Sequence, residues 1–110
     1  MLYAKIVVGL PVSGPFDYIV PGALEKMIQP GARVWVNFGP RRIVGYVVAL
    51  AKKSQVKNLK PVLELIDQQA LLNEKIILLT EKIADYYCCS WGEAIETALP
   101  EALRKGKKID

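Results

Sequence analysis

The sequence of 110 residues contains no histidine and only two cysteines, Cys88 and Cys89, which are adjacent. Without histidine there is no imidazole general base, no catalytic triad of the common type and no usual zinc site. Neighbouring cysteines are poorly placed to form a disulfide with each other. We therefore expect buried or chemically idle thiols in a reducing compartment, and no metal or other cofactor.

Long apolar runs and nucleotide-binding loops are also missing. No apolar run approaches the about 18 residues needed to cross a bilayer, and the start MLYAKIVVGLP lacks the pattern of a secretory signal. Neither GxxxxGK(S/T) nor GxGxxG occurs. The sequence predicts a cytoplasmic protein without a membrane partner, whose chain alone binds a ligand and is not an enzyme.

Acidic residues are absent from one long stretch. The net charge is +4, and every charged residue from position 33 to position 60 is basic: Arg33, Arg41, Arg42, Lys52, Lys53, Lys57 and Lys60. A local positive field of this kind favours polyanions such as nucleic acids. A solvated basic loop that keeps the domain soluble would have the same charge, so charge alone does not decide between the two.

The first half of the chain has the pattern of β-structure. Runs rich in β-branched residues, separated by proline and glycine turns, predict four strands near residues 3–10, 16–20, 32–38 and 43–50. Gly45, inside the fourth run, indicates a bulge or a close approach. We expect a small antiparallel sheet, curled into a partial barrel. With the helices predicted next, the fold class is α+β.

The second half is predicted to be helical, after a short extended piece, PVLELID. Asn73 is a good N-cap for a helix that runs to about Tyr87, and apolar residues recur at helical spacing at Ile76, Leu79, Ile83 and Tyr86. Ser90 and Glu93 match a capping box, which begins a second short helix, and Pro100 ends it or opens a final turn. We expect a β-rich subdomain at 1–66, a helical subdomain at 67–103 and a linker or tail at 104–110.

Asp17 is an unusual residue for the predicted strand PFDYIVP, because strands avoid aspartate. Strand alternation places Phe16 and Tyr18 on one face and Asp17 on the other. Asp17 is then either a solvated carboxylate or a functional one. By the same rule Trp35 lies opposite the apolar face of its strand, and we expect the helical half to cover it.

Five blocks of sequence occur in a characteristic order: PFDYIVP, QPGARVWVNFG, RRIVGYVVAL, LKPVLELID and LTEKIADYYCCSWGEAIETALP. Together they resemble the N-terminal 3′-DNA-end-binding domain of the PriA primosomal replication-restart helicases, over residues from about Lys5 to Pro100. The resemblance departs from the family at two positions, where Asn37 and Ser90 replace prolines. The first change predicts a less rigid turn, and the capping box explains the second.

The resemblance implies a function and a site. In that family the domain recognises the 3′ end of a nascent strand at stalled replication forks, in a pocket that corresponds here to Phe16, Asp17, Tyr18, Gly39 and Lys60. A carboxylate such as Asp17 can accept a hydrogen bond from a free 3′-hydroxyl and repels the phosphodiester of a continuing strand. Base identity should matter little, and the charges of Arg41 and Arg42 are expected to attract the DNA backbone beside Lys60.

The resemblance further implies that the chain is a fragment of an ATP-dependent DNA helicase. The rest of the helicase chain would then be a partner, together with DNA and with other primosome proteins. Two alternatives remain from the residues alone. A small RNA-binding barrel would prefer RNA and be indifferent to a free 3′ end, whereas a protein-interaction module would show no salt-dependent affinity for oligonucleotides.

Overall fold

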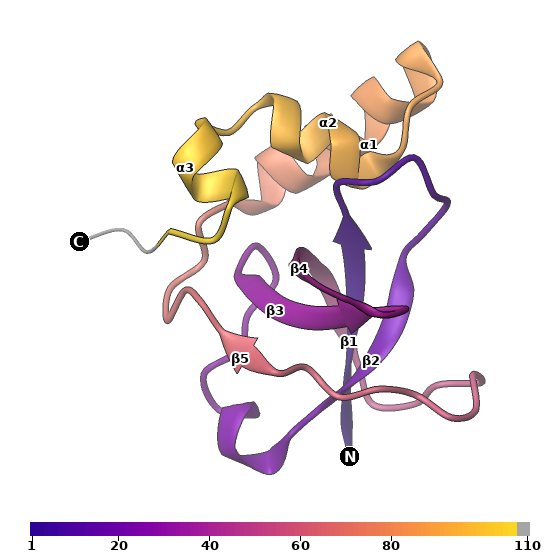
Figure 1. Ribbon diagram of the computed structural model, residues 1–110, viewed down its shortest axis with the longest axis vertical. Coiled ribbons are helices and arrows are strands. Elements are labelled where there is room, and N and C mark those ends of the chain that lie inside the picture. The colour runs from indigo at the N-terminus through magenta and orange to yellow at the C-terminus, as the bar shows by residue number, and fades with distance from the viewer. Residues whose placement is uncertain (108–110) are drawn as a thin grey trace.

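The chain folds into a β-rich half followed by a helical half, described by a computed structural model over residues 1–107 (Figure 1). Its strands are β1 (Leu2–Val8), β2 (Phe16–Val20), β3 (Arg33–Phe38), β4 (Arg41–Ala51) and β5 (Glu64–Leu65). Its helices are α1 (Glu74–Tyr87), α2 (Trp91–Thr97) and α3 (Glu101–Arg104), with a 3-10 turn at Gly22–Leu24. The four predicted strands are present, β5 lies within the predicted extended piece, and the α+β fold class is confirmed.

The strands form an antiparallel sheet in the order β2-β1-β4-β3-β5. The long β4 pairs with β1 on one side and with β3 on the other. A Cβ at Gly45 of β4 would lie 2.5 Å from Cγ2 of Ile6, so close packing explains this glycine. The bulge lies elsewhere in the β1–β4 pair, where the register shifts between Lys5 and Ile6.

One segment contacts both edges of the sheet. At the β2 edge, the amide of Ile19 donates to the carbonyl of Lys60 at 3.0 Å, and the amide of Val62 donates to the carbonyl of Ile19 at 2.9 Å. At the other edge β5 pairs with β3, and the amide of Leu63 donates to the carbonyl of Trp35 at 2.9 Å. The sheet therefore curls until its two edges share one connecting segment, as in a partial barrel, and this segment brings Lys60 beside β2.

Two apolar clusters lie on opposite faces of the sheet. The inner cluster fills the curled sheet with alternate strand residues, among them Tyr18 and Val34. The outer cluster joins Tyr46 of β4 to Ile95 of α2, and Trp35 packs against it. The predicted covering of the Trp35 face by the helical half is thus confirmed (Figure 1).

Arg33 does not belong to a basic surface, contrary to the reading of charge along the sequence. Its side chain is fully buried, and its guanidinium donates to both carboxylate oxygens of Asp67, at 2.8 and 2.7 Å. Its Nη1 also donates to the carbonyls of Leu103 and Lys107, at 2.7 and 2.8 Å. Arg33 therefore binds β3 to the end of α3. Of the predicted tail at 104–110, residues 108–110 lie outside the described residues.

The helix starts agree with the sequence. The side chain of Asn73 accepts a hydrogen bond from the amide of Ile76 at 2.9 Å, which caps α1. Ser90 and Glu93 form the predicted capping box at the start of α2, with each side chain bound to the other's amide. Pro100 opens the last turn as the N-cap of α3.

The apolar stripe predicted for α1 is not its buried face. Of the four stripe residues, Leu79, Ile83 and Tyr86 are 52%, 37% and 81% exposed. The buried residues of α1 are instead Ile77, Thr80 and Ala84. The indole of Trp91 in α2 donates to the hydroxyl of Thr80 at 3.1 Å, so α2 meets a face with a small polar residue at its centre. No helix among the described residues is long and apolar enough to cross a membrane.

Both cysteines are exposed free thiols at the end of α1. Cys88 is the C-cap of this helix, with φ at 56°, in the left-handed region where helices commonly end. The alternative that these thiols are buried is therefore wrong.

Candidate nucleic-acid interface

Asp17 lies in β2 directly opposite Lys5 of β1. The ammonium of Lys5 donates to Oδ1 at 3.0 Å, and the hydroxyl of Ser54, in the loop after β4, donates to Oδ2 at 2.6 Å. The bond from Ser54 is the main cause that holds the pKa of Asp17 below its ordinary value of 3.8; burial opposes this effect and Lys5 supports it. Asp17 is an ionised carboxylate whose side chain is only 11% exposed, rather than a freely solvated one.

A pocket of about 240 Å³ opens beside Asp17, where β2, the β3–β4 turn and the segment before β5 meet. Of the residues predicted to bind DNA, its lining includes Phe16, Asp17, Tyr18, Gly39 and Lys60. The lining is completed by Asn37, Phe38, Asn58 and Leu59. These residues come from three separate stretches of the sequence, so only the folded chain brings them together.

The two aromatic residues of β2 differ in their positions. Phe16 is half-buried, and its ring meets that of Phe38 edge to face with the ring centroids 5.2 Å apart. Tyr18 is buried, which raises the pKa of its phenol, and its hydroxyl donates to the carbonyl of Asn37 at 2.9 Å. Phe16 can therefore offer apolar surface to a sugar or a base, whereas Tyr18 holds the strand that leads into the β3–β4 turn.

Gly39 and Pro40 form this two-residue turn. Gly39 has φ at 61°, as the first central residue of a type II′ turn requires, and no atom of the described residues would lie within 4 Å of a Cβ there. The exposed ammonium of Lys60 donates to the carbonyl of Gly39 at 3.3 Å. The backbone of Gly39, which carries no side chain, and the ammonium of Lys60 therefore lie side by side at this pocket.

Arg41 and Arg42, also predicted to bind DNA, do not line the pocket. Both are exposed and follow the turn directly. The guanidinium of Arg42 is 3.2 Å from a carboxylate oxygen of Glu64 and lies over the ring of Trp35, 4.6 Å from its centroid. Arg41 forms no ion pair within residues 1–107. Arg41 is consequently better placed than Arg42 to contact a DNA backbone that leaves the pocket.

The basic loop after β4 keeps its charge exposed. Lys52, Lys53 and Lys57 are exposed, and none of them forms an ion pair with the described carboxylates. Ser54 ties this loop to Asp17. The loop that reaches Asp17 through Ser54 therefore carries three exposed positive charges, which suits a site for a polyanion.

Sequence reasoning missed Lys5, Ser54, Asn58 and Leu59 as parts of this region. Lys5 meets Asp17 only through the β1–β2 register, and Ser54 reaches it from a loop whose course depends on the whole fold. Asn58 has φ at 60°, a left-handed conformation in which asparagine is enriched. The presence of an asparagine within the loop was the one available signal, and it indicates a turn rather than a pocket.

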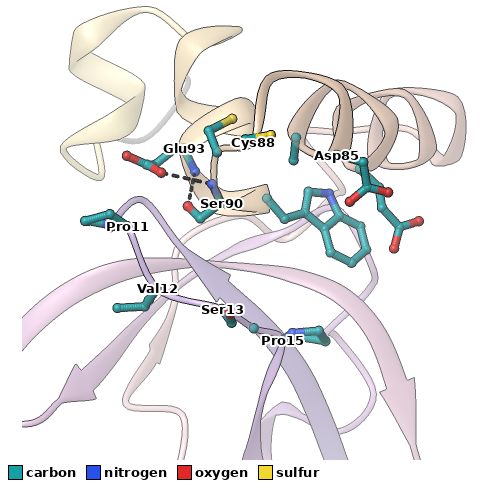
Figure 2. Close-up of a pocket in the computed structure, with 13 residues that line it drawn as sticks. Pro11, Val12, Ser13, Pro15, Asp85, Cys88, Ser90 and Glu93 are labelled. Carbon is teal, nitrogen blue, oxygen red and sulfur yellow. Dashed lines mark hydrogen bonds between the residues drawn. The ribbon is translucent and has the colours of Figure 1, made fainter.

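A larger cavity, of about 400 Å³, lies between the loop at 11–15 and the junction of α1 and α2 (Figure 2). The charged residues that line it are all acidic: Glu81, Asp85 and Glu93. Figure 2 shows Glu93 bound to Ser90 in the capping box, and the hydroxyl of Ser90 also donates to the carbonyl of Leu10 at 2.7 Å. Because these carboxylates would repel a phosphate backbone, this larger cavity is not the candidate DNA site.

A family model described as 3′DNA-binding domain (3′BD) matches residues 5–100 of the chain. The chain belongs to the 3′DNA-binding domain family. It is 35% identical over 109 residues to the replication restart protein PriA of Bacillus subtilis, 28% over 105 residues to that of Buchnera aphidicola from Acyrthosiphon pisum, and 31% over 109 residues to that of Haemophilus influenzae. These alignments cover 94%, 94% and 97% of the chain, but only 14%, 14% and 15% of the three relatives.

Membership of the 3′DNA-binding domain family confirms the resemblance seen in the five sequence blocks. It confirms DNA as the ligand class and argues against the RNA-binding barrel and the protein-interaction module. The roles of single residues in the pocket stay predictions.

Proposed function

We propose that the pocket beside Asp17 binds the 3′-terminal nucleotide of a DNA strand, with its free hydroxyl directed at the Asp17 carboxylate. The observation that carries this proposal is the convergence of five predicted residues, Phe16, Asp17, Tyr18, Gly39 and Lys60, on one pocket beside an ionised carboxylate. At about 240 Å³ the pocket is below the range of about 300–1,000 Å³ usual for small-molecule sites. Such a volume suits one partly exposed nucleotide.

Asp17 distinguishes an end from a continuing strand by charge. A terminal 3′-hydroxyl donates a hydrogen bond to the carboxylate, and a charge-assisted bond of this kind is stronger than a neutral one. An internal nucleotide carries a phosphodiester at the same position, whose negative charge the carboxylate repels. The bond between Lys5 and Asp17 reduces this repulsion without removing it, because Lys5 is 40% exposed and partly screened by water.

Binding is independent of base identity in this proposal. Gly39 leaves its backbone open to a base of any kind, and Phe16 offers apolar contact that does not depend on sequence. Lys60 contacts the strand as a point charge, which positions the backbone and reads no base.

Fluorescence anisotropy with one labelled oligothymidylate, ending in either a 3′-hydroxyl or a 3′-phosphate, tests the proposal. Tighter binding of the hydroxyl end is expected. A labelled oligonucleotide of the same length with a mixed base sequence and a 3′-hydroxyl should bind with the affinity of the oligothymidylate. Equal affinity for hydroxyl and phosphate ends would refute end recognition, whereas a strong preference for one base sequence would refute sequence independence.

The biological setting is inferred from the relatives, which are named replication restart proteins. The chain spans 14–15% of their length, so we infer that it serves as the end-binding part of a longer helicase chain acting on nascent strands at stalled forks. The remainder of that chain and other primosome proteins are its expected partners, and the cytoplasm its expected location.

A further inference from the structure

The loop that follows β4 is fixed to the edge of β2 at two points. The hydroxyl of Ser54 donates to Oδ2 of Asp17 at 2.6 Å, and two residues further along β2 the amide of Ile19 donates to the carbonyl of Lys60 at 3.0 Å. Asn58 and Leu59, between these two points, form one wall of the pocket. The bond from Ser54 is therefore at once a contact to the carboxylate and an anchor for the pocket wall.

Ser54 is itself held in place. The amide of Val56 donates to its Oγ at 3.2 Å, so the hydroxyl oxygen accepts from the loop backbone and its hydrogen is directed at Asp17. On the other side of the carboxylate, Lys5 donates to Oδ1 at 3.0 Å. Each carboxylate oxygen thus accepts one bond from the protein. An ionised carboxylate has about four acceptor sites, so each oxygen keeps a free lone pair for a ligand hydroxyl.

From this geometry we propose that Ser54 is a positioning residue for end recognition, which holds the Asp17 carboxylate in the orientation that accepts the terminal 3′-hydroxyl. The inference rests on the function proposed above and assigns it a residue outside the pocket lining. Ser54 itself does not contact the nucleotide. It acts through Asp17 alone.

The physical reason is the entropy cost of fixing the Asp17 side chain when the ligand binds. Without Ser54, Lys5 is the only side chain among residues 1–107 that still binds Asp17, and the carboxylate is free to rotate toward it and away from the pocket. A ligand hydroxyl would then have to fix a side chain that is already fixed in the wild type. Affinity for the hydroxyl end should fall, while affinity for the phosphate end, which gains nothing from Asp17, should not.

Anisotropy with the hydroxyl-ended and phosphate-ended oligothymidylates, applied to a set of variants, tests this inference. Ser54→Ala should weaken binding of the hydroxyl end by about three- to tenfold and should not weaken binding of the phosphate end. Ser54→Thr keeps the donor and should restore most of the difference. Gln55→Ala, in the same loop, is the matched control and should bind both ends as the wild type does. Thermal unfolding of each variant verifies that it is folded.

A double-mutant cycle separates this inference from a general role of the loop. In the Asp17→Ala background, Ser54→Ala should have no further effect, because the two residues act as one unit. If Ser54→Ala weakened both ends equally, or weakened binding without Asp17, the serine would only shape the loop and the inference would be wrong. If the wild type itself did not distinguish the two ends, the proposed function would fail; if it did and Ser54→Ala kept the full preference, only the role of Ser54 would fail.

Discussion

A carboxylate in the middle of a strand of a basic domain is costly unless something compensates it, and at Asp17 the compensation comes from Lys5 and Ser54. These two contacts keep Asp17 charged and oriented before any ligand arrives. Preorganisation of this kind lowers the cost of binding, since less order has to be created when the DNA end enters. In the proposed function, end recognition depends on this one negative charge, which Lys5 and Ser54 hold in place.

The lowered pKa of Asp17 predicts how binding responds to acid. Because the pKa lies below 3.8, Asp17 stays ionised and affinity for a hydroxyl-ended oligothymidylate should be constant from about pH 8 to about pH 5. The same shift stabilises the fold above the unfolded-state pKa, a contribution that is lost as the pH falls through the lower folded-state pKa. Anisotropy at constant ionic strength measures the profile. Loss of affinity with a midpoint above pH 5 would show that the ionised group on which binding depends is not Asp17.

Lys60 is expected to position the strand without reading its end. Lys60→Ala should weaken binding of hydroxyl and phosphate ends by the same factor and reduce the salt dependence by about one phosphate contact. Lys82→Ala, which removes an exposed lysine from α1, serves as the control. A Lys60 variant that kept full affinity but lost its preference for the hydroxyl end would assign this lysine to recognition rather than positioning.

The pocket residues differ in how far the sequence could reveal them. Phe16, Asp17, Tyr18, Gly39 and Lys60 were found through sequence blocks whose order identifies the family, and the structure places them around one pocket. Their neighbours in space could not be found in this way. A loop residue such as Ser54 meets its partner only after distant segments have packed, and no local pattern encodes that contact.

Arg33 links three elements: β3, the segment that follows β5, and α3. It is fully buried, and both oxygens of Asp67 and two backbone carbonyls accept its hydrogen bonds. A buried ion pair of this kind is costly to break, since either partner alone is left as an uncompensated charge. The two bonds from Arg33 to backbone carbonyls hold the end of the C-terminal helix against the sheet, and Asp67 compensates the buried charge.

Removing one partner of this pair should destabilise the fold strongly. Arg33→Met is expected to lower the free energy of unfolding by about 3–5 kcal/mol, and the additional change Asp67→Leu should recover most of the loss. Urea denaturation measures both. Arg42→Met is the matched control, because its ion pair with Glu64 is half exposed and should contribute only about 0–1 kcal/mol. An Arg33 variant no less stable than the Arg42 variant would contradict the linking role of Arg33.

Helix starts were predictable, whereas the buried face of α1 was not. The caps at Asn73 and Ser90 are local, because each side chain binds an amide three residues away. The buried face depends on what the helix meets, and the partner of Thr80 is the indole of Trp91, eleven residues further along the chain. Hydrophobic spacing therefore selected Leu79 and Ile83, which remain exposed.

Over the whole molecule, the chain joins the two edges of its sheet with one segment, and the loop that precedes this segment carries the exposed residues Lys52, Lys53 and Lys57. The segment runs from Lys60 to β5, and the basic loop precedes it (Figure 1). The hairpin turns could be read from proline and glycine. A curl into a partial barrel was also predicted, but the segment that closes it was not, because the closure depends on a contact between Ile19 and Pro61 that no turn or period signals.

A small pocket predicts a shallow dependence of binding on salt. One or two nucleotides bring few phosphates into contact, so the slope of log affinity against log salt should be well below that of proteins that make about 6–10 phosphate contacts. Anisotropy titrations of the hydroxyl-ended oligothymidylate over a range of salt concentrations give this slope. A slope near that of proteins with about 6–10 phosphate contacts would mean that the DNA also contacts Lys52, Lys53 and Lys57. The binding site would then extend beyond the pocket.

Whether Asp17 recognises the strand end is decided by the preference for a 3′-hydroxyl over a 3′-phosphate end, measured by anisotropy in the wild type and in Asp17→Ala. The variant should stay folded, lose about ten- to a hundredfold in affinity for the hydroxyl end, and reject the phosphate end less than the wild type does. Selectivity and affinity should fall together. A folded Asp17→Ala protein that still preferred the hydroxyl end by the wild-type margin would contradict the account, and recognition would then have to come from the shape of the pocket around Gly39.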